Sequence, residues 1–140
     1  MSHYVVDASV AVKWFVPEVH TGASLRLLDG SHELLAPDLL LPEFGNILWK
    51  KVRLGEITHE DGRDILRGLM AVPLDLYSSR DLFEPAFEIA NGINRSVYDS
   101  LYVALALRQD CQMVTADRRF HAALEASPLA ANLRWVEDEL

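Results

Sequence analysis

The order of the hydrophobic patterns constrains the fold of this chain more than any other feature. Short apolar runs typical of strands alternate with longer segments whose apolar residues recur at helical spacing. We expect strands at 3–7, 33–36, 72–76, 112–116 and 133–136, and helices at 8–16, 21–28, 39–54, 58–71, 79–91, 98–108 and 118–126. Because the connections are short, this alternation predicts an α/β fold with a parallel sheet covered by helices on both faces.

The chain is expected to form a single domain over residues 1–140, because no repeat, linker or low-complexity tract divides it. Its longest unbroken apolar run, from Leu101 to Leu107, is far shorter than the ~20 residues of a membrane helix. No targeting segment is visible, and the single cysteine, Cys111, fits a reducing compartment. These features predict a cytoplasmic protein without a membrane span.

The net charge of −8 argues against a general nucleic-acid binder, since an acidic surface repels backbone phosphates. The objection loses its force if several acids are gathered in one place, where bound cations would neutralise them. The positions of the acids therefore decide which functions are open to the chain.

Four acids stand at positions where the predicted fold would bring them together. Asp7 and Asp117 follow two expected strands, and the carboxyl ends of parallel strands share one edge of a sheet. Asp99 opens the helix expected at 98–108, which is apolar all round and must be buried. Glu43 lies in the first turns of the helix expected at 39–54, on or near its packed face.

Each acid taken alone has a simpler interpretation as a helix cap or a first-turn charge. Together, crowded carboxylates cannot all stay ionised without a counter-charge, and no Lys or Arg lies within two residues of Asp7, Glu43 or Asp99. Oxygen ligands without nearby Cys or His select a hard cation, Mg²⁺ or Mn²⁺. Zinc is not expected, because the histidines are scattered through the chain at 3, 20, 32, 59 and 121.

Two hydroxyls and three aromatic residues leave alternatives open. Thr115 could face the same pocket as Asp117, two residues further along a strand, whereas Ser9 could equally be a plain first-turn residue. Trp14, Phe15 and Trp49 could form core or a dimer surface, and core is the more usual place for such residues.

Four segments resemble the motifs of VapC-type PIN domains: 7–18, 41–48, 96–106 and 114–120. They occur in the right order, and the resemblance runs from residue 4 to about residue 121. It implies a three-layer α/β fold, RNA endonuclease activity, a homodimer and inhibition by a cognate VapB-type antitoxin. It also implies a Mg²⁺ site formed by Asp7, Glu43, Asp99 and Asp117, with Ser9 and Thr115 as accessory polar groups.

Within that resemblance we assign a hypothetical role to each acid. Asp7 and Asp99 would be the principal ligands, and Glu43 would bind the metal or orient the attacking water. Asp117 would hold a second metal or a metal-bound water, so that the number of ions stays open.

RNA binding would need local positive charge. Arg118 and Arg119 directly follow Asp117 and are the first candidates for phosphate contacts. Lys13 is a further candidate, and Lys50, Lys51 and Arg95 are weaker ones, since solvated helix faces also carry such residues.

Two other classes of function compete with a nuclease. A Mg²⁺-binding phosphoacceptor signalling domain would need an acidic pair after the first strand and a Lys after a late strand, and neither is present here. A non-catalytic PIN-like module that binds RNA or protein would have no need to gather uncompensated acids.

Overall fold

The computed structural model of the protein describes residues 2–140 and has a parallel sheet at its centre. The five strands lie in the order β3-β2-β1-β4-β5, and every neighbouring pair is parallel. Their bounds are β1 (Ser2–Val6), β2 (His32–Pro37), β3 (Leu74–Tyr77), β4 (Gln112–Thr115) and β5 (Leu133–Trp135). The predicted α/β class and the parallel sheet are confirmed.

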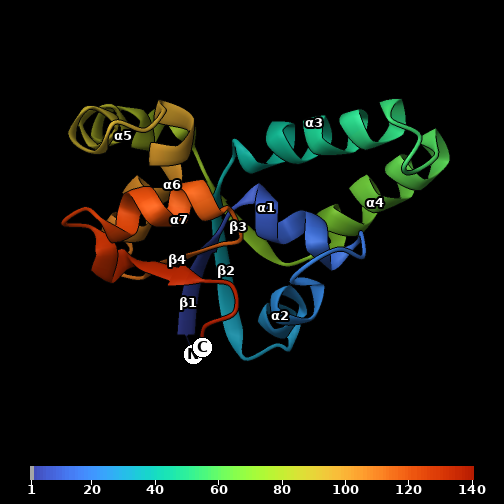
Figure 1. Ribbon diagram of the computed structural model, residues 1–140, viewed down its shortest axis with the longest axis horizontal. Helices are drawn as coiled ribbons and strands as arrows, with labels where there is room; N and C mark the ends of the chain where they lie inside the picture. The colour runs from blue at the N-terminus through green and yellow to red at the C-terminus, as the bar shows by residue number, and fades with distance from the viewer. Residues whose placement is uncertain (1) are drawn as a thin grey trace.

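Helices cover both faces of this sheet (Figure 1). The α-helices are α1 (Ala8–Ala11), α2 (Thr21–Leu25), α3 (Leu40–Arg53), α4 (His59–Ala71), α5 (Ser79–Ile93), α6 (Val97–Arg108) and α7 (Arg118–Glu125). Short 3₁₀ turns are η1 (Val12–Trp14), η2 (Arg26–Leu28) and η3 (Ala130–Asn132). The chain moves outward from β1 to β3 and then returns to β4 and β5. Right-handed crossovers therefore place α1 to α4 on one face and α5 to α7 on the other.

The strand order reverses between β1 and β4, and this reversal determines where the site lies. In open parallel sheets, a crevice forms outside the carboxyl ends of the strands at the point of reversal. The register pairs Val6 of β1 with Val114 of β4, so the residues that follow these two strands face each other across that crevice.

The core is built around α6, as its apolar sequence predicts. Every residue from Ser100 to Ala106 is buried, because the helix packs against α5 on one side and against β1, β2 and β4 on the other. Within residues 2–140, no helix has the length and hydrophobicity that crossing a membrane would require.

Three helices differ from the sequence expectation. The helix expected at 8–16 is split into α1 and η1, and the helix expected at 21–28 is split into α2 and η2. Helix α5 continues through Gly92 to Ile93, and its C-cap is Asn94, which adopts the left-handed conformation (φ 55°) that asparagine tolerates. The expected capping box at Thr58 and Asp61 is confirmed, with both reciprocal hydrogen bonds formed.

Helix α4 packs against Phe15 at Gly68, which leads to a stability prediction. A Cβ at residue 68 would lie 2.7 Å from Cε1 of Phe15, whose ring also contacts Phe44 edge-on. We expect Gly68→Ala to lower the free energy of unfolding by about 1–2 kcal/mol, because overpacking outweighs the helix propensity gained. Urea unfolding measures this difference.

The control is Gly92→Ala, whose Cβ meets nothing within 4 Å and which should be neutral or stabilising. A Gly68→Ala protein as stable as the Gly92→Ala protein would contradict the packing argument.

Candidate active site

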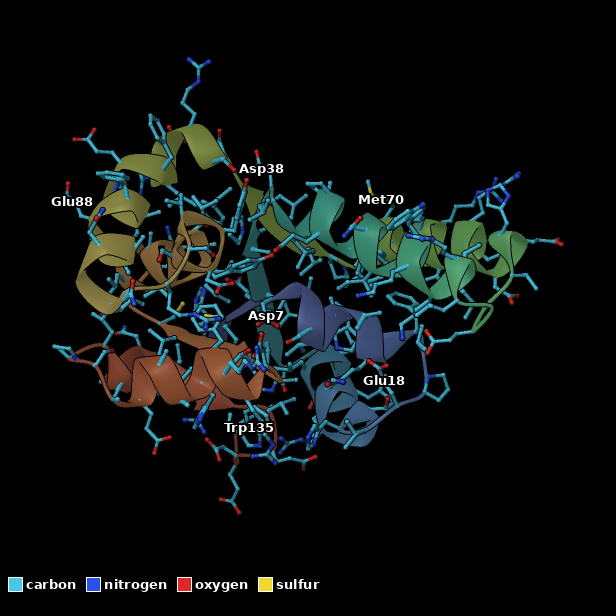
Figure 2. The ribbon with its side chains drawn as sticks, turned by 45° about the horizontal axis from the view of Figure 1, so that its top comes forward. Asp7, Glu18, Asp38, Met70, Glu88 and Trp135 are labelled. Atoms are coloured by element: carbon cyan, nitrogen blue, oxygen red, sulfur yellow. The ribbon has the colours of Figure 1, made fainter. Side chains whose placement is uncertain are left out.

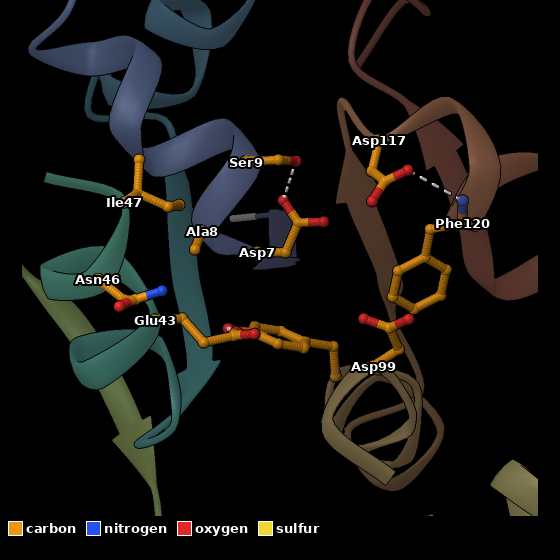
Figure 3. A pocket seen from close by; sticks show the side chains of 10 residues that line it. Asp7, Ala8, Ser9, Glu43, Asn46, Ile47, Asp99, Asp117 and Phe120 are labelled. Atoms are coloured by element: carbon orange, nitrogen blue, oxygen red, sulfur yellow. Dashed lines mark hydrogen bonds between the residues drawn. The ribbon is translucent and has the colours of Figure 1, made fainter. Parts of the chain in front are cut away.

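A pocket of about 250 Å³ opens at the carboxyl edge of the sheet, where the strand order reverses (Figure 3). All four acids singled out in the sequence line it: Asp7, Glu43, Asp99 and Asp117. The volume leaves room for several water molecules, each of which takes about 30 Å³ in the liquid. The sequence prediction that these four side chains share one pocket is therefore met by the geometry.

Asp7 is the most tightly held of the four acids and is only 6% exposed. Its Oδ1 accepts hydrogen bonds from the Ser9 hydroxyl at 2.6 Å and from the Val10 amide at 3.1 Å, and its Oδ2 accepts one from the Thr115 hydroxyl at 2.6 Å. Asp7 is thus the N-cap of α1 as well as a wall of the pocket.

The two hydroxyls are themselves oriented by the backbone. The Ala116 amide donates to Ser9 Oγ at 3.1 Å, and the Asp117 amide donates to Thr115 Oγ1 at 3.1 Å. Each hydroxyl accepts from β4 or the residues that follow it and donates to Asp7, so the carboxylate plane is fixed from both sides. Ser9 is therefore more than a first-turn residue in this structure.

Burial makes the Asp7 carboxylate costly to ionise. Loss of hydration raises the pKa of Asp7 to about 6, although the hydrogen bonds from Ser9, Thr115 and Val10 act in the opposite direction. The nearby charge of Asp117 adds to the increase. Among residues 2–140, no Lys, Arg or His forms a salt bridge with Asp7, and the same is true of Glu43.

Glu43 projects from the first turn of α3 towards α6, where Tyr102 donates a hydrogen bond to its Oε1 at 2.5 Å. Partial burial raises the pKa of Glu43, and the charge of Asp99 acts in the same direction. Tyr102 is buried and lines the pocket, although it was not among the site residues expected from the sequence. The available signal was a polar tip in the apolar run of α6, because a buried tyrosine hydroxyl needs a partner.

Asp99 is not free of a counter-charge. It occupies the third position of α6, whose N-cap is Ser96, and its Oδ2 accepts a hydrogen bond from Arg95 Nη2 at 2.7 Å. As expected, no Lys or Arg lies within two residues of Asp99. However, Arg95 lies four residues away, at the spacing that brings helical side chains together. Burial nevertheless raises the pKa of Asp99, because it outweighs the effect of Arg95.

Asp117 caps α7 and is the most exposed of the four acids. Its Oδ1 accepts hydrogen bonds from the Arg119 amide at 2.9 Å and the Phe120 amide at 3.1 Å. Within residues 2–140, no hydrogen bond engages Oδ2 of Asp117. The simpler cap interpretation is thus correct for this acid, and it leaves one oxygen for the pocket.

The donor set fits a hard cation that retains part of its water. Carboxylate and hydroxyl oxygens line the pocket, and cysteine and histidine are not among the lining residues. Across residues 2–140, no three acids, histidines or cysteines already converge closely enough to enclose an ion by themselves. Mg²⁺ is commonly bound through one or two carboxylates plus several waters, so this looser arrangement suits it.

The structure does not support Lys13 as a contact to RNA. Lys13 is only 8% exposed, and its Nζ donates to Glu18 Oε1 at 3.1 Å, so it is a buried structural cation and not a surface one. Lys51 also pairs with Glu18, at 3.2 Å. Arg118 and Arg119 remain exposed beside the pocket.

The three aromatic residues separate into two groups. Trp14 is buried and its Nε1 donates to the Ser24 carbonyl at 2.9 Å, and Phe15 packs against the core, so both fit the core expectation. Trp49 on α3 is 56% exposed and does not.

The fold and the acid pocket together define a class of protein: a three-layer α/β domain with carboxylates gathered at the reversal of a parallel sheet. Residues 4–124 match the family described as the PIN domain. Because the match covers most of the sequence, the chain belongs to the PIN domain family.

Known proteins resemble the chain along most of its length. It is 32% identical over 117 residues to "Ribonuclease VapC3" of Pyrobaculum aerophilum, covering 82% of this chain and 89% of that protein. The crystal structure of PAE2754 from the same organism superposes with a TM-score of 0.71 at 24% identity, covering 97% of this chain and 85% of that one. A toxin-antitoxin complex from Klebsiella pneumoniae superposes with a TM-score of 0.61 at 12% identity, covering 97% and 99%. The two structures support the fold alone.

Proposed function

We propose that the protein is a metal-dependent endoribonuclease and the toxin of a VapBC-type toxin–antitoxin pair. The observation that carries the proposal is the buried Asp7 carboxylate, held by two hydroxyls and facing three further acids in one pocket. The similarity to a protein named as a VapC ribonuclease supports RNA as the substrate.

We assign Asp7 and Asp99 as the principal ligands of Mg²⁺, for which Mn²⁺ would substitute, with Glu43 and Asp117 completing the site through water or directly. The bound ion would neutralise the phosphate and lower the pKa of a coordinated water. Asp7 contributes a fixed donor geometry, because Ser9 and Thr115 prevent its carboxylate from rotating. Arg95 would have to share Asp99 with the ion or leave it.

Glu43 is the group best placed to accept the proton of the attacking water. Its raised pKa lies closer to neutrality than that of an ordinary glutamate, which favours proton transfer near physiological pH. The hydrogen bond from Tyr102 orients the carboxylate across the pocket. Asp117, with one oxygen uncommitted, would hold a second ion or a water.

Tyr102→Phe tests that orienting role. The phenyl ring keeps the packing and removes only the hydroxyl, so we expect cleavage to fall by about 10–100-fold, as is typical when an outer partner of a site is removed. The fall should appear in kcat and shift the acid limb of the pH–rate profile. The matched control is Tyr98→Phe, an exposed tyrosine one turn earlier on α6, which should cleave normally. Equal rates for the two variants would show that Tyr102 is only a packing residue.

The proposed partners are an RNA substrate, a cognate VapB-type antitoxin and a second copy of the chain. The toxin-antitoxin complex among the structural neighbours supports an antitoxin by analogy. The direct test is to produce the chain in cells alone and together with the product of the adjacent short reading frame. Growth arrest that this product relieves is expected, and normal growth of cells that accumulate folded protein would contradict a toxin.

A cleavage assay tests the enzyme itself. The purified protein should cleave RNA in the presence of Mg²⁺, and cleavage should stop when a chelator is added. Calorimetry with Mn²⁺ should show binding at or below millimolar metal. Absence of both would favour the non-catalytic module.

A further inference from the structure

Trp135 lies at the same edge of the sheet as the acid pocket. It ends β5 and pairs in register with Thr115, whose hydroxyl donates to Asp7 Oδ2. Paired residues of neighbouring strands project to the same face, and neighbouring strands lie about 4.8 Å apart. Two strand spacings therefore put β5 about 10 Å from β1, and Figure 2 shows Trp135 beside α7.

Arg118 lies on this indole ring. Its Cζ is 4.9 Å from the Trp135 ring centroid, within the range of a cation–π contact. The side chain is nevertheless exposed, and among residues 2–140 no carboxylate forms a salt bridge with it. Arg118 directly follows Asp117, a wall of the pocket, so an unneutralised planar cation stands next to the proposed metal site.

The indole is held in place by its surroundings. The rings of His20 and His121 contact it edge-on, with centroids 5.4 and 5.3 Å away. Each histidine lies beside a glutamate: His20 Nδ1 is 2.7 Å from Glu137 Oε1, and His121 Nδ1 is 3.3 Å from Glu125 Oε2. Neither histidine–glutamate pair carries a net positive charge, and Arg118 is the cation that the cluster presents to solvent.

We propose that Trp135 and Arg118 form a nucleotide subsite that binds one unpaired base of the RNA strand and its phosphate, next to the position of cleavage. The proposal rests on the proposed function. Bases of single-stranded RNA stack on aromatic rings and on arginine planes, and guanidinium groups pair with phosphates. The subsite also explains how an acidic protein could hold an RNA strand beside its carboxylates.

Tryptophan fluorescence can observe the subsite directly. In the Trp49→Phe protein, the remaining tryptophans are Trp135 and the buried Trp14. The probe is a short unstructured RNA, titrated in chelator at low salt so that it is bound without being cut. We expect saturable quenching of Trp135. A strand of the same length that lacks bases should bind more weakly and quench little.

Matched variants separate stacking from charge. Arg118→Ala and Trp135→Leu should each weaken RNA binding about tenfold or more, the size of one base stack. Arg118→Lys keeps the charge without the plane and should lose most of the same affinity, whereas Trp135→Phe should retain part of it. The control Arg67→Ala removes an exposed cation from α4, outside the proposed subsite, and should leave RNA affinity unchanged.

Thermal unfolding must first show that the variants are folded. The results then distinguish a failure of the subsite from a failure of the proposed function. Binding that Arg118→Ala and Trp135→Leu leave unchanged, or equal binding of the strand without bases, would overturn the subsite while leaving metal-dependent cleavage intact. A parent protein that neither binds RNA here nor cleaves it in Mg²⁺ would overturn the subsite and the proposed function together.

Discussion

Replacing Asp7 with asparagine is expected to lower RNA cleavage in Mg²⁺ by on the order of a thousandfold, because several kcal/mol of transition-state stabilisation depend on the ion. Asparagine is nearly the same size and can still accept a hydrogen bond from Ser9, so the pocket should keep its shape. What it loses is the charge that holds the cation. Initial rates on a labelled RNA, measured over a range of Mg²⁺ concentrations, check this result.

The control for that experiment is Glu88→Gln, which removes an equal charge from the exposed surface of α5, far from the pocket (Figure 2). It should cleave at the parent rate. Asp99→Asn should resemble Asp7→Asn, although it also releases Arg95 from its ion pair. An Asp7→Asn protein within tenfold of the parent would remove Asp7 from the proposed machinery.

The same substitution is expected to stabilise the metal-free protein by up to about 3 kcal/mol at pH 7. The pKa of Asp7 is 3.8 without the influence of the fold and about 6 in the folded chain. Between these values only the folded chain holds the proton, so the free energy of unfolding falls by about 1.4 kcal/mol for each pH unit that the pH rises. Stability is therefore highest below pH 3.8 with respect to this group, and the loss is complete above pH 6. Asparagine has no carboxyl to titrate, so Asp7→Asn removes this loss of stability.

Urea unfolding in chelator at pH 4, 5, 6 and 7 measures this effect for the parent and for Asp7→Asn. The two curves should separate as the pH rises. Added Mg²⁺ should then stabilise the parent and leave the variant unchanged, because a ligand that binds only the folded state adds to stability. Curves that run parallel from pH 4 to pH 7 would show that burial does not perturb this carboxyl.

The parts of the site that the sequence could predict are those fixed by strand ends and helical periodicity. Asp7 and Asp117 meet because β1 and β4 are parallel neighbours, and Val6 pairs with Val114. Glu43 faces the pocket because it shares a helical face with Leu40, which is buried. The burial of α6 follows from an apolar run with no polar face.

The missed contacts depend on distances between elements or on longer local spacings. The bond from Tyr102 to Glu43 joins residues 59 positions apart and requires the separation between α3 and α6. The stack of Arg118 on Trp135 likewise requires the position of β5. In contrast, the pair of Arg95 with Asp99 follows the i, i+4 spacing of a helix, so the sequence alone can predict it.

Lys13 differs from these cases, because a lysine is expected at the surface by residue type but is buried here. Lys13 lies in η1, and its buried side chain pairs with Glu18, five residues later. Sequence periodicity predicted one continuous helix there and therefore could not orient this side chain.

The central claim is that carboxylates distant in sequence form one cation site, and diffraction from crystals soaked in Mn²⁺ tests it most directly. Anomalous difference maps should show a peak about 2 Å from oxygens of Asp7 and Asp99, a normal ligand distance for such ions. The Asp7→Asn crystal should lack that peak. Parent crystals without the peak at millimolar Mn²⁺, with Arg95 still bonded to Asp99, would contradict the account.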